Sequence, residues 1–116
     1  MRVHHLALRV GDVGRSLAFY TGLLRLTERR RLAQGESLRA AWLEAGETIL
    51  MLEQELRGRG PESGSGHVLA FEVDNLTAWE ARLAEAGLAI DDRTAHTLCF
   101  RDPDGHRVAL SSHPLR

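Results

Sequence analysis

Two short segments carry residues of the types that bind ligands. One reads His4-His5-Leu6-Ala7-Leu8-Arg9-Val10-Gly11-Asp12, and the other reads His67-Val68-Leu69-Ala70-Phe71-Glu72-Val73-Asp74-Asn75. An imidazole can hydrogen-bond or bind a metal ion, and an arginine can hold an anionic group through two parallel hydrogen bonds. We therefore expect His5 to contact a ligand. Arg9 and Glu72 either pair with each other or serve a ligand, with Arg9 on an anionic group.

The two segments are copies at a constant offset of 63 residues, from His4 to His67 and from Asp12 to Asn75. Each copy begins with alternating apolar and polar residues, which predicts a strand. Leu6, Leu8 and Val10 share one face, so His5 and Arg9 share the other. Asp12 and Asn75 are suitable N-caps for the amphipathic segments that follow. A supersecondary unit is therefore repeated.

The remaining strands follow from short apolar runs that are separated by turn residues. The pattern predicts strands over residues 3–10, 25–31, 37–43 and 48–54 in the first copy, and 67–73, 88–93, 97–101 and 107–111 in the second. Each copy thus reads strand-helix-strand-strand-strand. The predicted fold class is α+β, with two tandem βαβββ modules forming a curved, partly open mixed-sheet trough and helices on the outside. A trough with convergent polar groups is a usual place for a small ligand.

Four glycines, a proline and two serines lie among residues 57–66, which predicts a linker. We expect one domain over residues 1–116, with module one at about 1–56 and module two at about 67–116. The formal net charge is −1, which gives no electrostatic case for nucleic acid or a membrane surface as partner. Cys99 is the single cysteine, and no apolar run is long enough to span a bilayer. These features predict a cytoplasmic protein with an inert thiol.

Four motifs make the chain resemble the vicinal-oxygen-chelate superfamily, which includes glyoxalase I, extradiol dioxygenases, fosfomycin-resistance enzymes and bleomycin-resistance proteins. The motifs are His5-Leu-Ala-Leu-Arg-Val-Gly-Asp, Ser16-Leu-Ala-Phe-Tyr, Phe71-Glu-Val-Asp-Asn and Phe100-Arg-Asp-Pro-Asp-Gly. The resemblance covers nearly the whole chain and implies paired βαβββ modules. In the metal-dependent members, the first and last strands of each module supply histidine or glutamate ligands to a divalent ion.

Carried over position by position, the resemblance places His5, Val68, Met51 and Ala109 where those ligands would be. The constant offset makes His67 the partner of His4, so only a β-bulge would turn His67 inward. One imidazole does not make a catalytic metal site, which needs three or four protein ligands. We therefore expect no metal. The alternative is a divalent ion held by His5, His67 and Glu53.

The sequence thus predicts a small-molecule-binding protein similar to the bleomycin-resistance branch, acting as a homodimer without a catalytic metal. One alternative is a divergent metal-dependent enzyme of glyoxalase or dioxygenase type, and another is a structural or regulatory dimer. The expected ligand-binding residues are His5, Arg9, Trp42, Met51, Glu53, Glu72 and Arg107.

Overall fold

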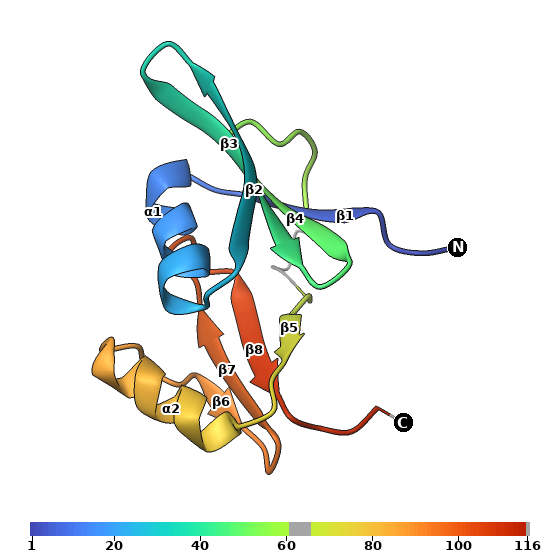
Figure 1. Cartoon of the computed structure of the whole chain (residues 1–116), viewed down its shortest axis with the longest axis vertical. Coiled ribbons are helices and arrows are strands. Elements are labelled where there is room, and N and C mark those ends of the chain that lie inside the picture. Colours follow the sequence, from blue (N-terminus) through green and yellow to red (C-terminus); the bar gives the residue numbers. More distant parts are fainter. Residues whose placement is uncertain (61–65, 116) are drawn as a thin grey trace. The chain divides into compact units, whose positions relative to one another are not determined.

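The computed structural model describes residues 1–60 and 66–115. The chain divides into two compact units, Met1–Arg59 and Gly60–Arg116. Each unit holds one four-stranded mixed sheet and one helix, in the order strand-helix-strand-strand-strand (Figure 1). The α+β class and the tandem modules are therefore confirmed. The predicted linker, residues 57–66, lies partly outside the described residues, and the trough between the modules stays a prediction.

The first unit begins with β1 (His5–Arg9) and α1 (Val13–Leu17), which continues into a π-helical segment (Ala18–Leu23). The strands β2 (Thr27–Gln34), β3 (Ser37–Ala45) and β4 (Thr48–Glu53) follow. The strand order is β1-β4-β3-β2, with β1 parallel to β4. Gly35 and Gly46 lie in the two hairpin turns with φ of 63°, a conformation that glycine adopts without steric cost.

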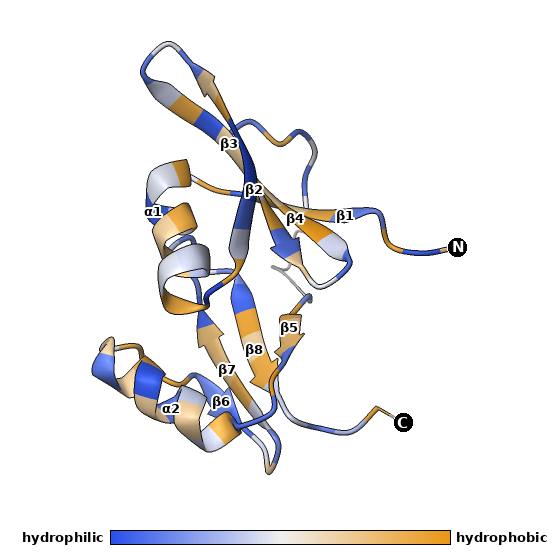
Figure 2. Ribbon diagram, viewed as in Figure 1, coloured by the Kyte–Doolittle hydropathy of each residue, from blue (hydrophilic) through white to orange (hydrophobic). Residues whose placement is uncertain are grey.

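The second unit repeats this plan with β5 (Leu69–Glu72) and α2 (Leu76–Glu85). The strands β6 (Asp92–Arg93), β7 (Thr97–Arg101) and β8 (Arg107–Ser111) complete it. The order is β5-β8-β7-β6, with β5 parallel to β8. β8 is largely hydrophobic, whereas β2 of the first unit is largely hydrophilic (Figure 2). Central strands are thus the apolar ones, as burial requires.

Strand pairing fixes the face on which each side chain of the first sheet lies. Leu6 is opposite Leu50 and Leu8 is opposite Leu52, while Leu43 is opposite Leu50. Leu43, Leu50 and Leu52 are buried, and α1 contacts β3 and β4. These leucines therefore form the helix-covered face. Leu6 shares that face but stays 39% exposed, because β1 is an edge strand.

The second sheet follows the same rule. Val108 and Leu110 are buried opposite Leu69 and Phe71 of β5, and Phe100 is buried opposite Val108. α2 contacts β7, so this is again the helix-covered face. The predicted apolar faces of both first strands are confirmed by these registers.

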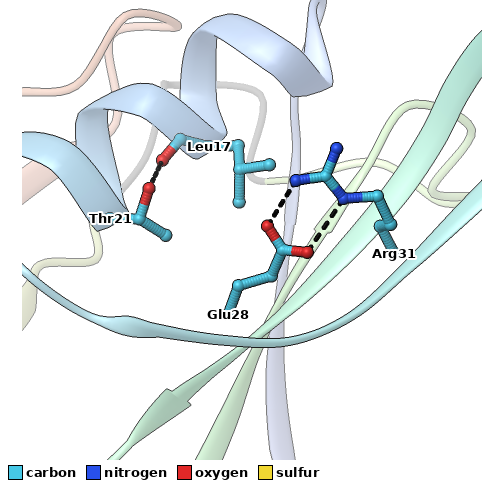
Figure 3. Close-up of polar contacts among 4 residues, drawn as sticks. All are labelled: Leu17, Thr21, Glu28 and Arg31. Carbon is cyan, nitrogen blue, oxygen red and sulfur yellow. Dashed lines mark hydrogen bonds and ion pairs between the residues drawn. The ribbon is translucent and has the colours of Figure 1, made fainter.

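Side chains start both helices where the sequence predicts. Asp12 accepts a hydrogen bond from the Arg15 amide, and Asn75 accepts one from the Ala78 amide. Each N-cap satisfies an amide that has no partner within the helix. Further along, the Thr21 hydroxyl donates to the Leu17 carbonyl at 2.6 Å (Figure 3), within the segment that widens to π-helical geometry.

A β-bulge in β2 arranges the basic run of that strand. Residues three apart in a regular strand face opposite ways, but the register shifts between Glu28 and Arg30. Glu28 and Arg31 consequently lie on one face and form a bidentate ion pair of 2.6 and 2.8 Å (Figure 3). Hydrogen bonding from Arg31 lowers the pKa of Glu28.

Several predicted strand limits were wrong. The strand expected over residues 67–73 is shortened to β5, so His67 lies before it. The strand expected over residues 88–93 is reduced to β6, because the ladder with β7 pairs Asp92 and Arg93, and before them the Asp91 amide donates to the Cys99 carbonyl at 2.7 Å. The strand expected over residues 25–31 is shifted to β2, since Leu26 still bonds to Tyr20 at the helix end. No helix in the described residues is long and apolar enough to cross a membrane.

Candidate functional site

The open face of the first sheet gathers most of the predicted ligand-binding residues. Pairing of β1 with β4 sets His5 opposite Ile49, Ala7 opposite Met51 and Arg9 opposite Glu53. Trp42 of β3 lies opposite Met51, and Arg30 of β2 lies opposite Trp42. Directly paired residues share a face, so these side chains stand on the side that α1 does not cover. His5, Arg9, Trp42, Met51 and Glu53 therefore share one surface.

Trp42 forms the centre of that surface. The Arg30 guanidinium lies over the indole, 5.3 Å from the ring centroid. This distance fits a cation–π contact. The indole Nε1 is buried without a hydrogen-bond partner among the described residues. A buried donor without an acceptor costs free energy, so Trp42 adds an unused polar atom to this face.

Arg9 is held by the segment that follows β4. Its Nε donates to the Leu56 carbonyl at 2.8 Å, and its Nη2 donates to the carbonyls of Leu56 and Gly58. The guanidinium thus fastens this segment beside the open face. An ion pair with Glu72 of the other unit stays a prediction.

Two predicted site residues share an unusual state: Glu53 in the first unit and Arg107 in the second. Both are half-buried, and neither side chain has a hydrogen bond or ion pair with another described residue. Other half-buried charged residues have partners: Arg39 pairs with Glu55, and Glu80 pairs with Arg93. Partial burial of an unpaired charge is unfavourable, so both groups are available to a ligand.

The open face of the second sheet is built from small residues. Ala70, Ala109 and Cys99 lie side by side across β5, β8 and β7. Beside them runs a polar row in which Glu72 is opposite Ser111, and Ser111 bonds to the Thr97 hydroxyl at 2.8 Å. In the first sheet, the row equivalent to Ala70, Ala109 and Cys99 consists of Ala7, Met51 and Trp42. The two open faces therefore have the same strand register but side chains of different size.

The positions to which the family resemblance assigns metal ligands do not supply a complete set of donor atoms for a divalent ion. Ala7 and Ala70 are related by the repeat; Met51 lies opposite Ala7, and Ala109 lies opposite Ala70. The register therefore supports Met51 and Ala109 as corresponding positions of the two modules. A thioether and a methyl group do not bind a hard ion. Ala109 is also only 1% exposed. Among residues 1–60 and 66–115, no three His, Cys, Asp or Glu side chains form a group that could hold a metal. The residues present do not fit such an ion.

The alternative ligands do not converge within the first unit either. His5 and Glu53 are four residues apart in register, which is roughly 13 Å along the strand direction. The two adjacent imidazoles instead contact each other, with 2.8 Å between Nδ1 of His4 and Nδ1 of His5. His67 precedes β5, so the alternation of a strand does not set its direction. The expectation that His67 does not face the open side stays a prediction.

The second unit also has a polar hollow of about 570 Å³. It is bordered by Asn75 and Thr77 at the start of α2, by Thr94 between β6 and β7, and by Ser112 after β8. The Glu80–Arg93 ion pair at its edge lowers the pKa of Glu80. No predicted site residue lines this hollow.

The sequence analysis missed one pair of side chains. His96 and His113 have ring centroids 5.5 Å apart. They are 17 residues apart and the repeat does not relate them. The sequence therefore offered no sign of their contact beyond the fact that both are histidines. Strand alternation places them on opposite faces, and only the end of β8 brings them together.

Comparison with known proteins gives one family model and several relatives. The model of the Glyoxalase/Bleomycin resistance protein/Dioxygenase superfamily matches residues 2–110. Metallothiol transferase FosB of Staphylococcus epidermidis is 29% identical over 123 residues, which cover 98% of this chain and 83% of that protein. Glutathione transferase FosA of Serratia marcescens is 31% identical over 115 residues, which cover 93% of this chain and 78% of that protein.

Solved structures show the same fold. A glyoxalase/dioxygenase from Nostoc punctiforme has a TM-score of 0.74 at 28% identity, and the match covers 97% of this chain and 91% of that one. TnmS3, an antibiotic binding protein from Streptomyces sp. CB03234, has a TM-score of 0.74 at 24% identity, covering 96% and 94%. At that identity the likeness to TnmS3 shows the fold alone.

Proposed function

We propose that this chain, which belongs to the Glyoxalase/Bleomycin resistance protein/Dioxygenase superfamily, binds a small organic molecule on its open sheet faces without a catalytic metal. The observation that carries the proposal is that two half-buried charges, Glu53 and Arg107, have no partner among the described residues. A ligand that pairs with either charge offsets the cost of its partial desolvation.

The chemistry of the two faces describes the ligand. Arg107 donates to an anionic or carbonyl oxygen, and Glu53 accepts from an ammonium, amide or hydroxyl group. On the first sheet Trp42 and Met51 supply an apolar wall that His5 and Arg9 border, and on the second sheet Glu72 lies on the open face. We propose that the ligand is an organic molecule with an apolar body and polar substituents, and that a homodimer binds it.

The donor set is the reason for preferring binding to metal catalysis. Met51 and Ala109 offer no oxygen or nitrogen where the family places ligands, and Val68 occupies the position equivalent to His5. Val68 is 48% exposed and lies before β5. We derive no reaction step through a metal ion at these residues.

A metal-dependent transferase is the second candidate, because a metallothiol transferase and a glutathione transferase are relatives across nearly the whole chain. In that case His5, His67 and Glu53 would hold a divalent ion. It requires His5 and Glu53, which lie roughly 13 Å apart along the strand direction, to converge with His67 on one ion.

A thermal-shift screen of polar aromatic acids and amides with the full chain, purified without an affinity tag, tests the proposal. Compounds bound to the native state raise Tm by mass action. We expect Arg107→Gln or Glu53→Gln to abolish the shift, whereas Glu36→Gln, at an exposed turn, leaves it unchanged.

Metal analysis of the same preparation separates the two candidates. Stoichiometric metal that is lost on His5→Ala and on His67→Ala would favour the transferase. Binding that Arg107→Gln and Glu53→Gln leave unchanged would refute the proposed site. A single species of monomer mass in sedimentation at micromolar concentration would contradict the homodimer.

A further inference from the structure

His96 and His113 lie against each other in the second unit. His96 directly precedes β7, and His113 follows β8. Their ring centroids are 5.5 Å apart and the ring planes are inclined at 81°. Both residues are exposed, so solvent and dissolved ions reach them. The contact lies wholly within the second unit.

Local backbone geometry creates this contact. Thr97 is opposite Ser111, and the Ser112 amide donates to the His96 carbonyl at 2.9 Å. Continued alternation would place His113 on the face opposite His96. β8 ends at Ser111 instead, where the Ser111 hydroxyl accepts a hydrogen bond from the His113 amide at 3.2 Å. This turn of the chain allows the two rings to meet.

Neighbouring hydrogen bonds hold both backbones in place. The Ser111 and Thr97 hydroxyls are 2.8 Å apart, and the His96 amide donates to the Thr94 hydroxyl at 3.3 Å. A pair of ligands whose backbones are already fixed loses less conformational entropy on binding.

We propose that His96 and His113 together bind one divalent transition-metal ion of the copper, nickel or zinc type. Imidazole nitrogen suits these ions. A metal–nitrogen bond is about 2 Å long, so two nitrogens on one ion lie roughly 3 Å apart. The broad terminal torsion of histidine lets both rings turn their nitrogens toward a shared point from the observed separation. Water completes the coordination.

This site is independent of the proposed ligand faces. It uses neither His5 nor Glu53 nor Arg107, and it tethers the residues after β8 to the start of β7. Failure of one site therefore leaves the other standing. It also differs from the alternative family metal site, which needs His5 and His67.

Calorimetric titration of the tag-free full chain with nickel chloride tests the proposal. We expect one equivalent to bind at this pair. His96→Gln and His113→Gln should each weaken binding by at least the roughly 10–100-fold that loss of a metal's outer-shell partner causes. His5→Ala serves as the control and should leave this affinity unchanged.

Copper-induced broadening of histidine resonances in the unmutated protein supplies a second measurement, which does not depend on whether a variant folds. We expect the resonances of His96 and His113 to broaden first and together. Absence of nickel binding would overturn the proposal. So would binding that His5→Ala abolishes and His96→Gln leaves intact, or broadening that begins at His4 and His5.

Discussion

Replacing Asp102 by alanine removes the acceptor that organises the turn between β7 and β8. The Asp102 side chain is 5% exposed, and its Oδ1 accepts hydrogen bonds from the amides of Asp104 and His106, each at 2.9 Å. A hydrogen bond to a charged group contributes about 1.5–3 kcal/mol. Asp104 and His106 are half-buried, so water replaces part of the loss. We expect Asp102→Ala to lower the free energy of unfolding by about 2–4 kcal/mol.

Fluorescence-detected unfolding in urea and by heat measures this effect. In a Trp42→Phe background Trp79 is the tryptophan left, and it reports on the second unit. A loss of this size lowers Tm by roughly 8–16 °C. Asp102→Asn keeps one acceptor oxygen and should lose about half as much. Asp92→Ala is the control: its exposed carboxylate accepts one local amide, and its effect should stay within about 0.5 kcal/mol. An Asp102→Ala protein as stable as this control would refute the reasoning.

Three further predictions follow from the first unit. Leu52→Ala should lower the free energy of unfolding, measured by chemical denaturation, by about 2–5 kcal/mol. Leu6→Ala should lower it by under about 1.5 kcal/mol, because that side chain is partly exposed. Equal losses would mean that a second chain covers Leu6. Arg31 lowers the pKa of Glu28, so the ion pair stabilises the fold above the ordinary carboxylate pKa and is lost as pH falls through the depressed value. Acid titration of stability should therefore be flatter in Glu28→Gln, and an unchanged curve would disprove this pair's role. Arg9→Met releases the segment after β4, so limited trypsin digestion should cut it faster than in the unmutated chain; equal rates would contradict that anchor.

The sequence by itself determined the repeat, the helix starts and the faces of the strands. Alternation along a strand is local, so Leu6 and Leu8 in one copy predict the buried face, and the constant offset extends this to Leu69 and Phe71. The family resemblance placed Met51 beside His5, alternation put Glu53 on the same face as Met51, and the strand register confirms that face. Caps such as Asp12 depend on a few neighbouring residues and are equally readable.

Only the tertiary structure decided which polar groups meet and which are left without partners. Arg9 bonds to carbonyls of a segment far along the chain, and His113 reaches His96. Within residues 1–60 and 66–115, the side chains of Glu53 and Arg107 have no partner. Each outcome depends on where a strand ends and how the following residues turn. The position of each strand end depends on competition among backbone and side-chain hydrogen bonds over several residues. The residue types alone do not show which hydrogen bonds form. Hydrophobic alternation therefore fixes which face is open, whereas long-range hydrogen bonds fix the chemistry on it.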